Sequence, residues 1–202
     1  NIYEKTVDFE YRKNLGEFYT PKTVVNHILE SIGYTSQEVI RNKKLIDISC
    51  GSGSFLIESV KILKHYLLSC YENISTEIAK KIISEIRKNI CGIDLNPIAC
   101  ILCQLNLFIS LFDLIKVVYQ EEPEYQLDYF NIKNFNALRL SNEEKYDFVV
   151  GNPPYLFIRD ISHQHRQLIE KSNLETNIGQ YDYYQIFIEI GLKILKNHGS
   201  FG

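Results

Sequence analysis

The stretch Tyr146-Asp147-Phe148-Val149-Val150-Gly151-Asn152-Pro153-Pro154-Tyr155 joins an apolar run to an abrupt change of chemistry. The run over 146–150 predicts a buried β-strand, because a short apolar segment of this kind fits the interior of a sheet. The two prolines cannot continue a central strand, since neither has a backbone N–H to donate to a neighbour. We therefore expect the chain to leave a sheet at Gly151 as a stiff, extended loop.

This loop is rich in hydrogen-bond acceptors and poor in donors. The side-chain carbonyl of Asn152 and the backbone carbonyl of Pro153 can both accept from one amino group, because no proline N–H competes for them. Tyr155 adds a flat ring on which an aromatic base can stack. The exocyclic amine of adenine, with its two N–H donors, fits this arrangement. The alternative is purely structural: a strand that ends in a Pro-Pro turn beside a packed tyrosine.

A second stretch, Asp47-Ile48-Ser49-Cys50-Gly51-Ser52-Gly53-Ser54-Phe55, follows a short buried strand predicted over 45–49 and leads into a long helix. A glycine-rich turn between a strand and a helix lets a ligand approach the backbone closely. Leu56 stands where the dinucleotide fingerprint has its third glycine, which disfavours NAD. Asp47, near the end of the strand, can accept hydrogen bonds from the ammonium group of an amino-acid moiety.

A third feature is the acid at the end of the next predicted strand, Ile90–Leu95, which follows an amphipathic helix over 75–89. Asp94 is placed to accept from the two ribose hydroxyls of a nucleoside. The alternative is that Asp94 only caps the helix that Asn96-Pro97 opens. The apolar helix that follows, Ile98–Phe112, is expected to be buried.

Upstream, Gly16-Glu17-Phe18-Tyr19-Thr20-Pro21 precedes an amphipathic segment that Gly33 ends. Thr20 is predicted to be the N-cap of this helix and Pro21 its first residue. The open N–H groups at such a helix start can receive a carboxylate. The alternative is a well-capped helix with no binding role.

The remaining segments complete an alternation of strands and helices. Leu127–Lys133 predicts a third strand and is followed by 134–138. The polar segment 161–171, with His163, His165 and Arg166, is expected to be a solvated helix, although it could also approach DNA. The stretch 180–184 opens a helix, and a new strand is expected to start near 199. Residues predicted on the core side of that helix are Phe187, Ile190, Leu192 and Leu195.

Composition sets limits on the class of protein. The 202 residues suffice for one α/β domain, and the net charge of −3 places most contacts to DNA phosphates outside this segment or in a local patch. No apolar run is long enough for a membrane span and no signal peptide is visible, so we expect a cytoplasmic protein. The five cysteines predict reduced thiols. Cys100 and Cys103 have a metal-like spacing without a second pair, and no metal is expected.

The motifs resemble those of S-adenosylmethionine-dependent N6-adenine DNA methyltransferases with an Asn-Pro-Pro-Tyr motif, of the restriction–modification type. Their order is that of type I modification subunits and fused type IIG-like enzymes: Phe18–Pro21, the glycine loop, Asp94 to Pro97, then Asn152–Tyr155. The similarity runs from residue 16 to the C-terminus. Two positions depart from the family pattern. Ile48 stands where proline is frequent, and Asn136 stands where the family has an acid in Gly-Asp-Ala-Leu.

The resemblance implies a doubly wound, mostly parallel α/β sheet of the Rossmann-like methyltransferase type, truncated before its last strands. It implies that 1–202 is a catalytic domain, with a helical lead-in over about 1–40 and a core over about 41–202. The implied catalytic residues are Asn152, Pro153, Pro154 and Tyr155. The implied S-adenosylmethionine-binding residues are Tyr19, Thr20, Asp47, Ser49, Gly51, Gly53, Asp94, Leu95, Asn136, Ala137 and Asn152.

The implied activity is methylation of the N6 amine of an adenine that has been flipped out of duplex DNA. The implied partner is a target-recognition domain or specificity subunit outside this segment. Two alternatives remain open. One is an amino-methyltransferase that acts on protein glutamine or on guanine in RNA, against which the element Phe18–Pro21 argues. The other is a non-catalytic DNA-binding subunit that keeps the fold.

Overall fold

The sheet is parallel throughout and confirms the predicted architecture. The computed structural model describes residues 20–35, 37–155, 161–172, 174–176 and 182–202. Its five strands have the spatial order β3-β2-β1-β4-β5. They are β1 (Leu45–Asp47), β2 (Ile90–Asp94), β3 (Asn131–Asn134), β4 (Tyr146–Val150) and β5 (Leu195–Phe201). Strand order reverses between β1 and β4, and ligands of open α/β sheets bind at such a switch point.

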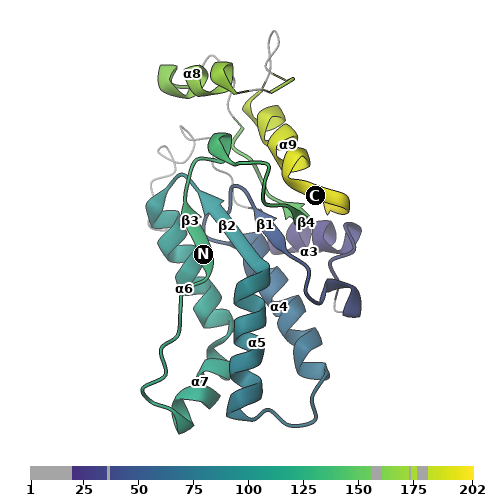
Figure 1. The fold of residues 1–202 in the computed structure, drawn as a ribbon, viewed down its shortest axis with the longest axis vertical. Helices are drawn as coiled ribbons and strands as arrows, with labels where there is room; N and C mark the ends of the chain where they lie inside the picture. The colour runs from purple at the N-terminus through teal and green to yellow at the C-terminus, as the bar shows by residue number, and fades with distance from the viewer. Residues whose placement is uncertain (1–19, 36, 156–160, 173, 177–181) are drawn as a thin grey trace.

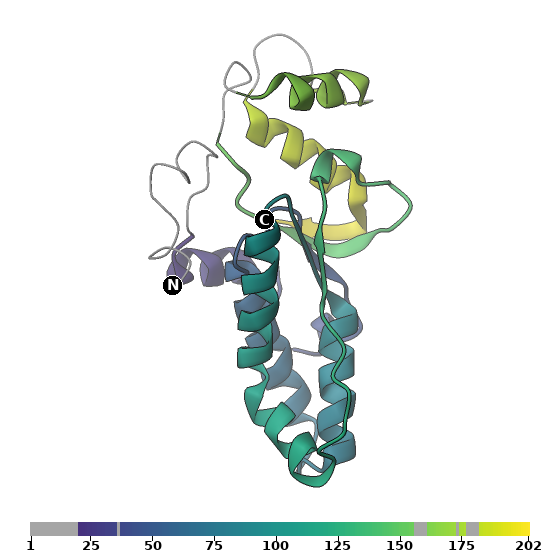
Figure 2. The same ribbon diagram turned by 90° about the vertical axis from the view of Figure 1, so that its left-hand side faces the viewer.

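Helices cover both faces of the sheet (Figures 1 and 2). Consecutive strand residues point to opposite faces, so Leu45 joins the larger buried cluster and Ile46 joins the smaller one. The larger cluster includes α3 (Lys22–Ser31), α4 (Ser54–Ser69), α5 (Thr76–Asn89), α6 (Pro97–Ser110) and α7 (Phe112–Glu121). The smaller includes residues of α8 (His163–Lys171) and α9 (Tyr183–Ile194). The short 3₁₀ helices are η1 (Glu38–Ile40) and η2 (Ala137–Arg139).

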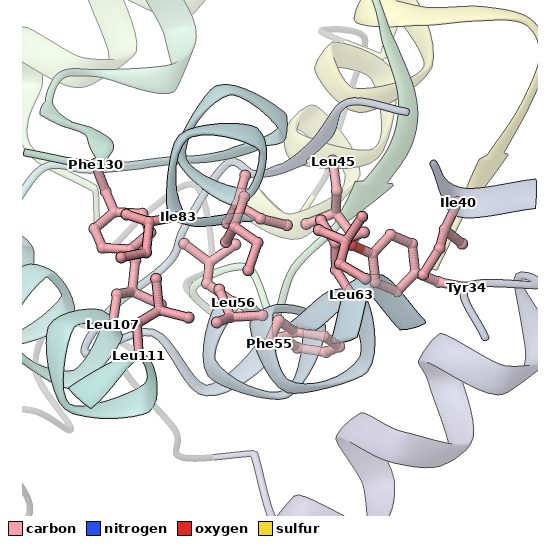
Figure 3. Close-up of a cluster of buried hydrophobic side chains, with 14 of the residues drawn as sticks. Tyr34, Ile40, Leu45, Phe55, Leu56, Leu63, Ile83, Leu107, Leu111 and Phe130 are labelled. Carbon is pink, nitrogen blue, oxygen red and sulfur yellow. The ribbon is translucent and has the colours of Figure 1, made fainter. Parts of the chain in front are cut away.

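The larger core holds the strand that carries the glycine loop. Figure 3 shows Leu45 of β1 beside Leu63 of α4, with Tyr34 and Phe55 nearby. The Tyr34 ring meets Phe148 of β4 edge-on, with 5.1 Å between the ring centroids. Burying one such side chain stabilises the fold by about 1.5–3 kcal/mol. This packing fixes the point at which the chain passes from β1 into α4.

The helix ends follow the capping chemistry of the sequence. The Ser75 side chain caps α5 by accepting from Ile78 N, and Asn96 caps α6. Asp182 and Gln185 form a capping box at the start of α9. Gly33 ends α3 with a φ of +80°, a conformation that favours glycine.

The start of α3 differs from the prediction. Its N-cap is Pro21, whose carbonyl accepts from the backbone N–H groups of Val24 and Val25, and the helix begins at Lys22. Pro21 has a ψ of 142°, so the chain is still extended at the position predicted to be the first helical residue. Thr20 therefore lies one residue before the cap and is not the predicted N-cap.

Strand limits also differ from the prediction, most clearly at β3, which begins at Asn131 rather than Leu127. The reason lies in α6, because the Gln104 side chain donates to the Phe130 carbonyl and accepts from the Phe130 N–H. These bonds occupy the backbone that would otherwise pair with β2. β1 ends at Asp47 and β2 at Asp94, one or two residues earlier than predicted.

The prediction that the apolar helix after Asn96 is buried was wrong for half of its surface. α6 buries Ala99, Cys100, Cys103 and Leu107, while Ile101 is 66% exposed. The helix packs on the sheet and α4 along this one stripe, and no described segment covers the opposite stripe. The other exposed apolar residues of that stripe and its continuation are Ile98, Leu105, Ile109 and Phe112.

The end of the chain shows two further differences. β5 starts at Leu195, directly after α9, so the strand begins before the predicted position 199 and Leu195 is not helical. Leu192 is 55% exposed, and the core side of α9 is formed instead by Ile186, Phe187, Ile190 and Ile194. Leu192 lies two residues from Ile190, which turns it about 200° away around a helix.

Among the helices that the structure describes, none by itself has the length and apolar composition of a membrane span. The pair α6 and α7, bent by 69°, meets that test only when the two are taken together.

Candidate active site

The polar residues singled out in the sequence gather at the carboxyl ends of β1, β2 and β4. In the register of the sheet, Asp47 lies opposite Gly92 on one side and Val150 on the other. Asp94 is therefore two residues beyond the partner of Asp47, and Asn152 is two residues beyond Val150. Parallel pairing brings three segments that are distant in sequence to one edge.

The closest contact in this group joins the loop after β4 to the end of β1. A Cβ atom at Gly151 would lie 3.0 Å from Asp47 Oδ1 and 3.1 Å from Ser49 Oγ. A larger residue would have to displace these polar atoms, so glycine lets the chain pass directly over them. The following residue, Asn152, is half-buried. The loop is thus held against the strand end that leads into the glycine turn.

Two polar groups beneath this contact are buried. The Asp47 carboxylate is 1% exposed and accepts from the Ser49 N–H at 3.0 Å. The Ser49 hydroxyl oxygen is also buried, and among the described residues it has no hydrogen-bond partner. An orphaned hydroxyl beside a buried carboxylate is costly unless a ligand satisfies it.

Burial alters the ionisation of both acids at the site. Loss of hydration raises the pKa of Asp47 to about 8, with a smaller contribution from the charge of Asp94, while the Ser49 N–H acts in the opposite direction. Burial also raises the pKa of Asp94, which hydrogen bonds from Asn96, Gly51 and Leu95 counteract. A cationic ligand group would favour the charged form of Asp47.

The glycine loop depends on glycine at two positions for different reasons. Gly51 has a φ of +52°, and a Cβ there would meet nothing within 4 Å, so its backbone conformation is the reason. Gly53 has a φ of +94°, and a Cβ there would also lie 2.7 Å from Cys103 Sγ on α6. The loop is anchored by Cys50 N, which donates to the Ile93 carbonyl at 3.0 Å.

Asp94 connects the glycine loop to the start of α6. Its Oδ2 accepts from Gly51 N at 2.8 Å, and its Oδ1 accepts from Asn96 N at 2.8 Å. The cap of α6 is Asn96, whose Oδ1 accepts from Ile98 N and Ala99 N, so Asp94 is not the helix cap. Each Asp94 oxygen keeps a lone pair for a further donor.

Beyond Asp94, the chain borders a cavity of about 560 Å³. Leu95 and Phe135 give it apolar surface and are 55% and 38% exposed. Asn136 lines it as well, and its Oδ1 accepts from Leu138 N at 3.0 Å as the cap of η2. Ala137 is buried beside it. The other lining residues are Asn134, Arg139, Gln167, Leu168 and Lys171.

The aromatic ring of the loop has a neighbour that the sequence analysis did not assign to the site. Tyr155 is 54% exposed, and its ring centroid lies 6.0 Å from that of Tyr184, with 38° between the planes. Tyr184 is in the first turn of α9. The available signal was the pair of tyrosines directly after the capping residue Asp182, since the buried Tyr183 leaves its neighbour to face elsewhere.

The upstream element is only partly described. Tyr19 lies outside the described residues, and Thr20 is half-buried. The start of α3 is tied to the first turns of α4 by Lys22 and Glu58, whose charged atoms are 3.5 Å apart. The structure therefore places this helix start beside the helix that the glycine loop opens.

These features define the class of the domain and its family. The fold is the Rossmann-like fold of S-adenosylmethionine-dependent methyltransferases. Residues 88–202 match the Eco57I restriction-modification methylase family, and the chain belongs to that family.

Individual relatives agree with this assignment. The type II restriction enzyme and methyltransferase RM.Eco57I of Escherichia coli is 26% identical over 91% of this chain and 22% of its own length. The type II methyltransferase M.BstVI of Geobacillus stearothermophilus is 29% identical over 93% of this chain and 32% of its own length. The chain thus spans about a fifth to a third of these relatives. The type IIL restriction-modification enzyme MmeI, solved with DNA, superposes with a TM-score of 0.67 and 17% identity, over 96% of this chain and 30% of the other.

Proposed function

We propose that this domain transfers a methyl group from S-adenosylmethionine to the N6 amine of adenine in DNA, within a restriction–modification system. The observation that carries the proposal is the close approach of Gly151 to Asp47 and Ser49. It places the Asn-Pro-Pro-Tyr loop directly beside the polar groups at the glycine loop. Residues 1–202 would then be the catalytic domain, and a target-recognition domain or specificity subunit would lie outside them.

The residues at the sheet edge fit S-adenosylmethionine. The buried Asp47 carboxylate and the orphaned Ser49 hydroxyl suit the ammonium group of the amino-acid end. Asp94 keeps lone pairs for the ribose hydroxyls. The apolar surface of Leu95 and Phe135 beyond Asp94 suits a flat base, and Asn136 and Ala137 lie beside it. Gly51 leaves open space above the backbone between these groups.

The chemistry required of the protein is mainly positioning. S-adenosylmethionine, when bound, supplies a methyl group already activated by the positive charge on sulfur. The Asn152 side-chain carbonyl and the Pro153 carbonyl hold the two N–H groups of the target amine. Their hydrogen bonds favour a tetrahedral nitrogen with a localised lone pair, which an aromatic amine otherwise lacks. Pro154 keeps this loop extended, and acceptors fixed before the reaction need no reorganisation.

The target base must leave the duplex to reach this loop. Extrusion costs a few kcal/mol, and stacking on an aromatic side chain recovers about 1–3 kcal/mol. Tyr155 offers an exposed ring for this purpose, and Tyr184 lies against that ring on one side. The element at Tyr19 and Thr20 stays predicted as a further part of the cofactor site.

The decisive test is methylation by the full-length protein with a donor carrying a labelled methyl group. Double-stranded DNA, RNA and protein are offered separately, and the modified residue is identified by mass spectrometry after digestion. N6-methyladenine in DNA is the expected product. Label in protein glutamine or in guanine of RNA would replace the proposal by the other amino-methyltransferase class. Cofactor binding without transfer to any acceptor would favour a non-catalytic subunit.

Tyr155 should respond to loss of its ring and tolerate loss of its hydroxyl. Tyr155→Ala should weaken capture of the flipped base by about 1–3 kcal/mol, whereas Tyr155→Phe keeps the stacking surface and most of the activity. Steady-state kinetics and the fluorescence of 2-aminopurine at the target position measure both effects. Tyr119→Ala, an exposed tyrosine on α7, is the matched control. Equal inactivity of Tyr155→Phe and Tyr155→Ala would refute the stacking role.

Asp47 should link cofactor binding to pH. Its pKa of about 8 means that it is protonated at neutral pH before the ligand binds. Formation of a carboxylate–ammonium pair then releases about one proton below pH 8. Above pH 8 the α-amino group of the free cofactor, with a pKa near 7.7–8.0, must regain a proton. Affinity should therefore rise with pH up to about 8 and fall beyond it.

Calorimetry at about pH 6.5 in buffers of different ionisation enthalpy measures this proton release directly. The wild-type protein should release about one proton per bound cofactor, and Asp47→Asn should release none. Asp128→Asn, at an acid whose side chain is 79% exposed, is the matched control and should behave as the wild type does. Proton release that persists in Asp47→Asn would show that Asp47 does not face the ammonium group.

A further inference from the structure

The cavity beyond Asp94 has a second, charged part that cofactor binding does not use. It lies between η2 and α8, which contribute Arg139 and Lys171 to its lining. Neither aspartate nor glutamate is among the lining residues. The cavity thus combines two cations with the amide groups of Asn134 and Gln167, which is a lining suited to an anion.

Arg139 and Lys171 differ from most cations of this chain. Both are exposed, and neither forms an ion pair with a carboxylate in the part of the chain that the structure describes. Other cations have such partners, for example Lys44 with Glu144 at 2.8 Å and Lys64 with Asp113 at 2.9 Å. Two cations left without acids in one cavity form a local positive patch on a chain whose net charge is −3.

The anion that this patch receives is unlikely to be part of the cofactor on geometric grounds set by the strand order. Asp47 on β1 takes the amino-acid end in the proposed function, and Asp94 on β2 takes the ribose. Leu95 and Phe135 then receive the base at the far end. The only carboxylate of the cofactor therefore points toward β1, away from η2 and α8. The two cations face a ligand that approaches the same edge of the sheet from solvent.

We propose that Arg139 and Lys171 bind backbone phosphates of the DNA that carries the target adenine. This inference rests on the proposed function. An arginine guanidinium pairs with phosphate through two parallel N–H donors, and a lysine adds a point charge. Such contacts carry no sequence information and position the duplex. The patch lets an acidic catalytic domain hold DNA near the Asn-Pro-Pro-Tyr loop.

The test is the salt dependence of DNA binding by the full-length protein, followed by fluorescence anisotropy with a labelled duplex containing the methylated site. The double variant Arg139→Ala/Lys171→Ala should reduce the slope of log K against log salt by about 1.8, or about 0.9 for each phosphate released. Its affinity at about 0.1 M salt should fall on the order of tenfold. Affinity for S-adenosylmethionine and kcat at saturating DNA should be unchanged.

Two control variants make the result specific. Arg139→Lys/Lys171→Arg keeps both charges and should retain the wild-type slope. Lys88→Ala/Lys116→Ala removes the same charge from two exposed lysines on α5 and α7, and it should also retain the slope. α7 lies at the opposite end of the molecule from α8 in both views (Figures 1 and 2).

Three results would overturn the inference. One is an unchanged slope in Arg139→Ala/Lys171→Ala. Another is weaker cofactor binding with DNA affinity intact, which would assign the cations to the cofactor. The third is loss of ATP binding with DNA binding intact, which would assign them to a free nucleotide. The proposed function is judged separately by the wild-type methylation product, so adenine methylation with an unchanged slope refutes this inference alone.

Discussion

Asn152→Ala should lower kcat by about 10²–10³-fold while cofactor affinity stays within about twofold, a loss typical of removing one preorganised hydrogen-bond partner from a reacting group. The reason is that the Asn152 carbonyl accepts most strongly when the amine nitrogen becomes tetrahedral. An interaction that strengthens only in the transition state affects kcat and kcat/KM by the same factor. Rapid-quench measurement of a single turnover, with enzyme in excess over DNA, isolates the methyl-transfer step.

Two variants define what the asparagine contributes. Asn152→Asp keeps an acceptor in the same place and should retain more activity than Asn152→Ala. Asn73→Ala changes an exposed asparagine in the loop between α4 and α5 and should leave kcat unchanged. Normal turnover by Asn152→Ala would mean that the loop is not catalytic. The reading of this domain as a DNA-binding subunit would then be favoured.

The sequence was most informative where chemistry interrupts a regular pattern. The double proline after Val150, the glycines after Asp47 and the Asn96-Pro97 pair each mark the end of a strand. All three lie at one edge of the sheet in the structure. These positions could be predicted because proline, glycine and capping asparagine restrict the backbone locally, whatever surrounds them.

Features that depend on contacts between distant segments could not be predicted in the same way. Nothing local to Gln104 shows that its side chain holds the backbone of Phe130 and delays the start of β3. The apolar composition of α6 does not show which of its faces the described chain covers. Tyr184 reaches Tyr155 only because α9 follows β4 back to the same edge.

The structure also changed the meaning of Asp94. The sequence offered ribose binding and helix capping as alternatives, but the observed carboxylate does something different from capping. It bridges Gly51 N and Asn96 N, and so holds the glycine loop against the start of α6. A ligand role for Asp94 therefore has to be separated from this structural one.

Asp94→Ala should weaken S-adenosylmethionine binding by about 10–150-fold, equivalent to about 1.5–3 kcal/mol for a hydrogen bond to a charged group. It should also lower the melting temperature, because two backbone N–H groups lose their acceptor. Asp94→Asn keeps one oxygen for these donors and should be less destabilised. Titration calorimetry and thermal unfolding by circular dichroism measure the two effects on the same samples.

Adenosine separates the direct role of Asp94 from its effect on the loop, since it has the ribose but not the amino-acid end. Asp94→Asn should weaken adenosine binding, because the ribose hydroxyls lose a charged acceptor. Asp47→Asn should leave adenosine binding unchanged and weaken only the complete cofactor. The two residues contact opposite ends of one ligand in this scheme, so the contrast tests its orientation. If both variants lowered affinity for adenosine equally, general loosening of the glycine loop would explain the loss, and the assignment of Asp94 to the ribose would be wrong.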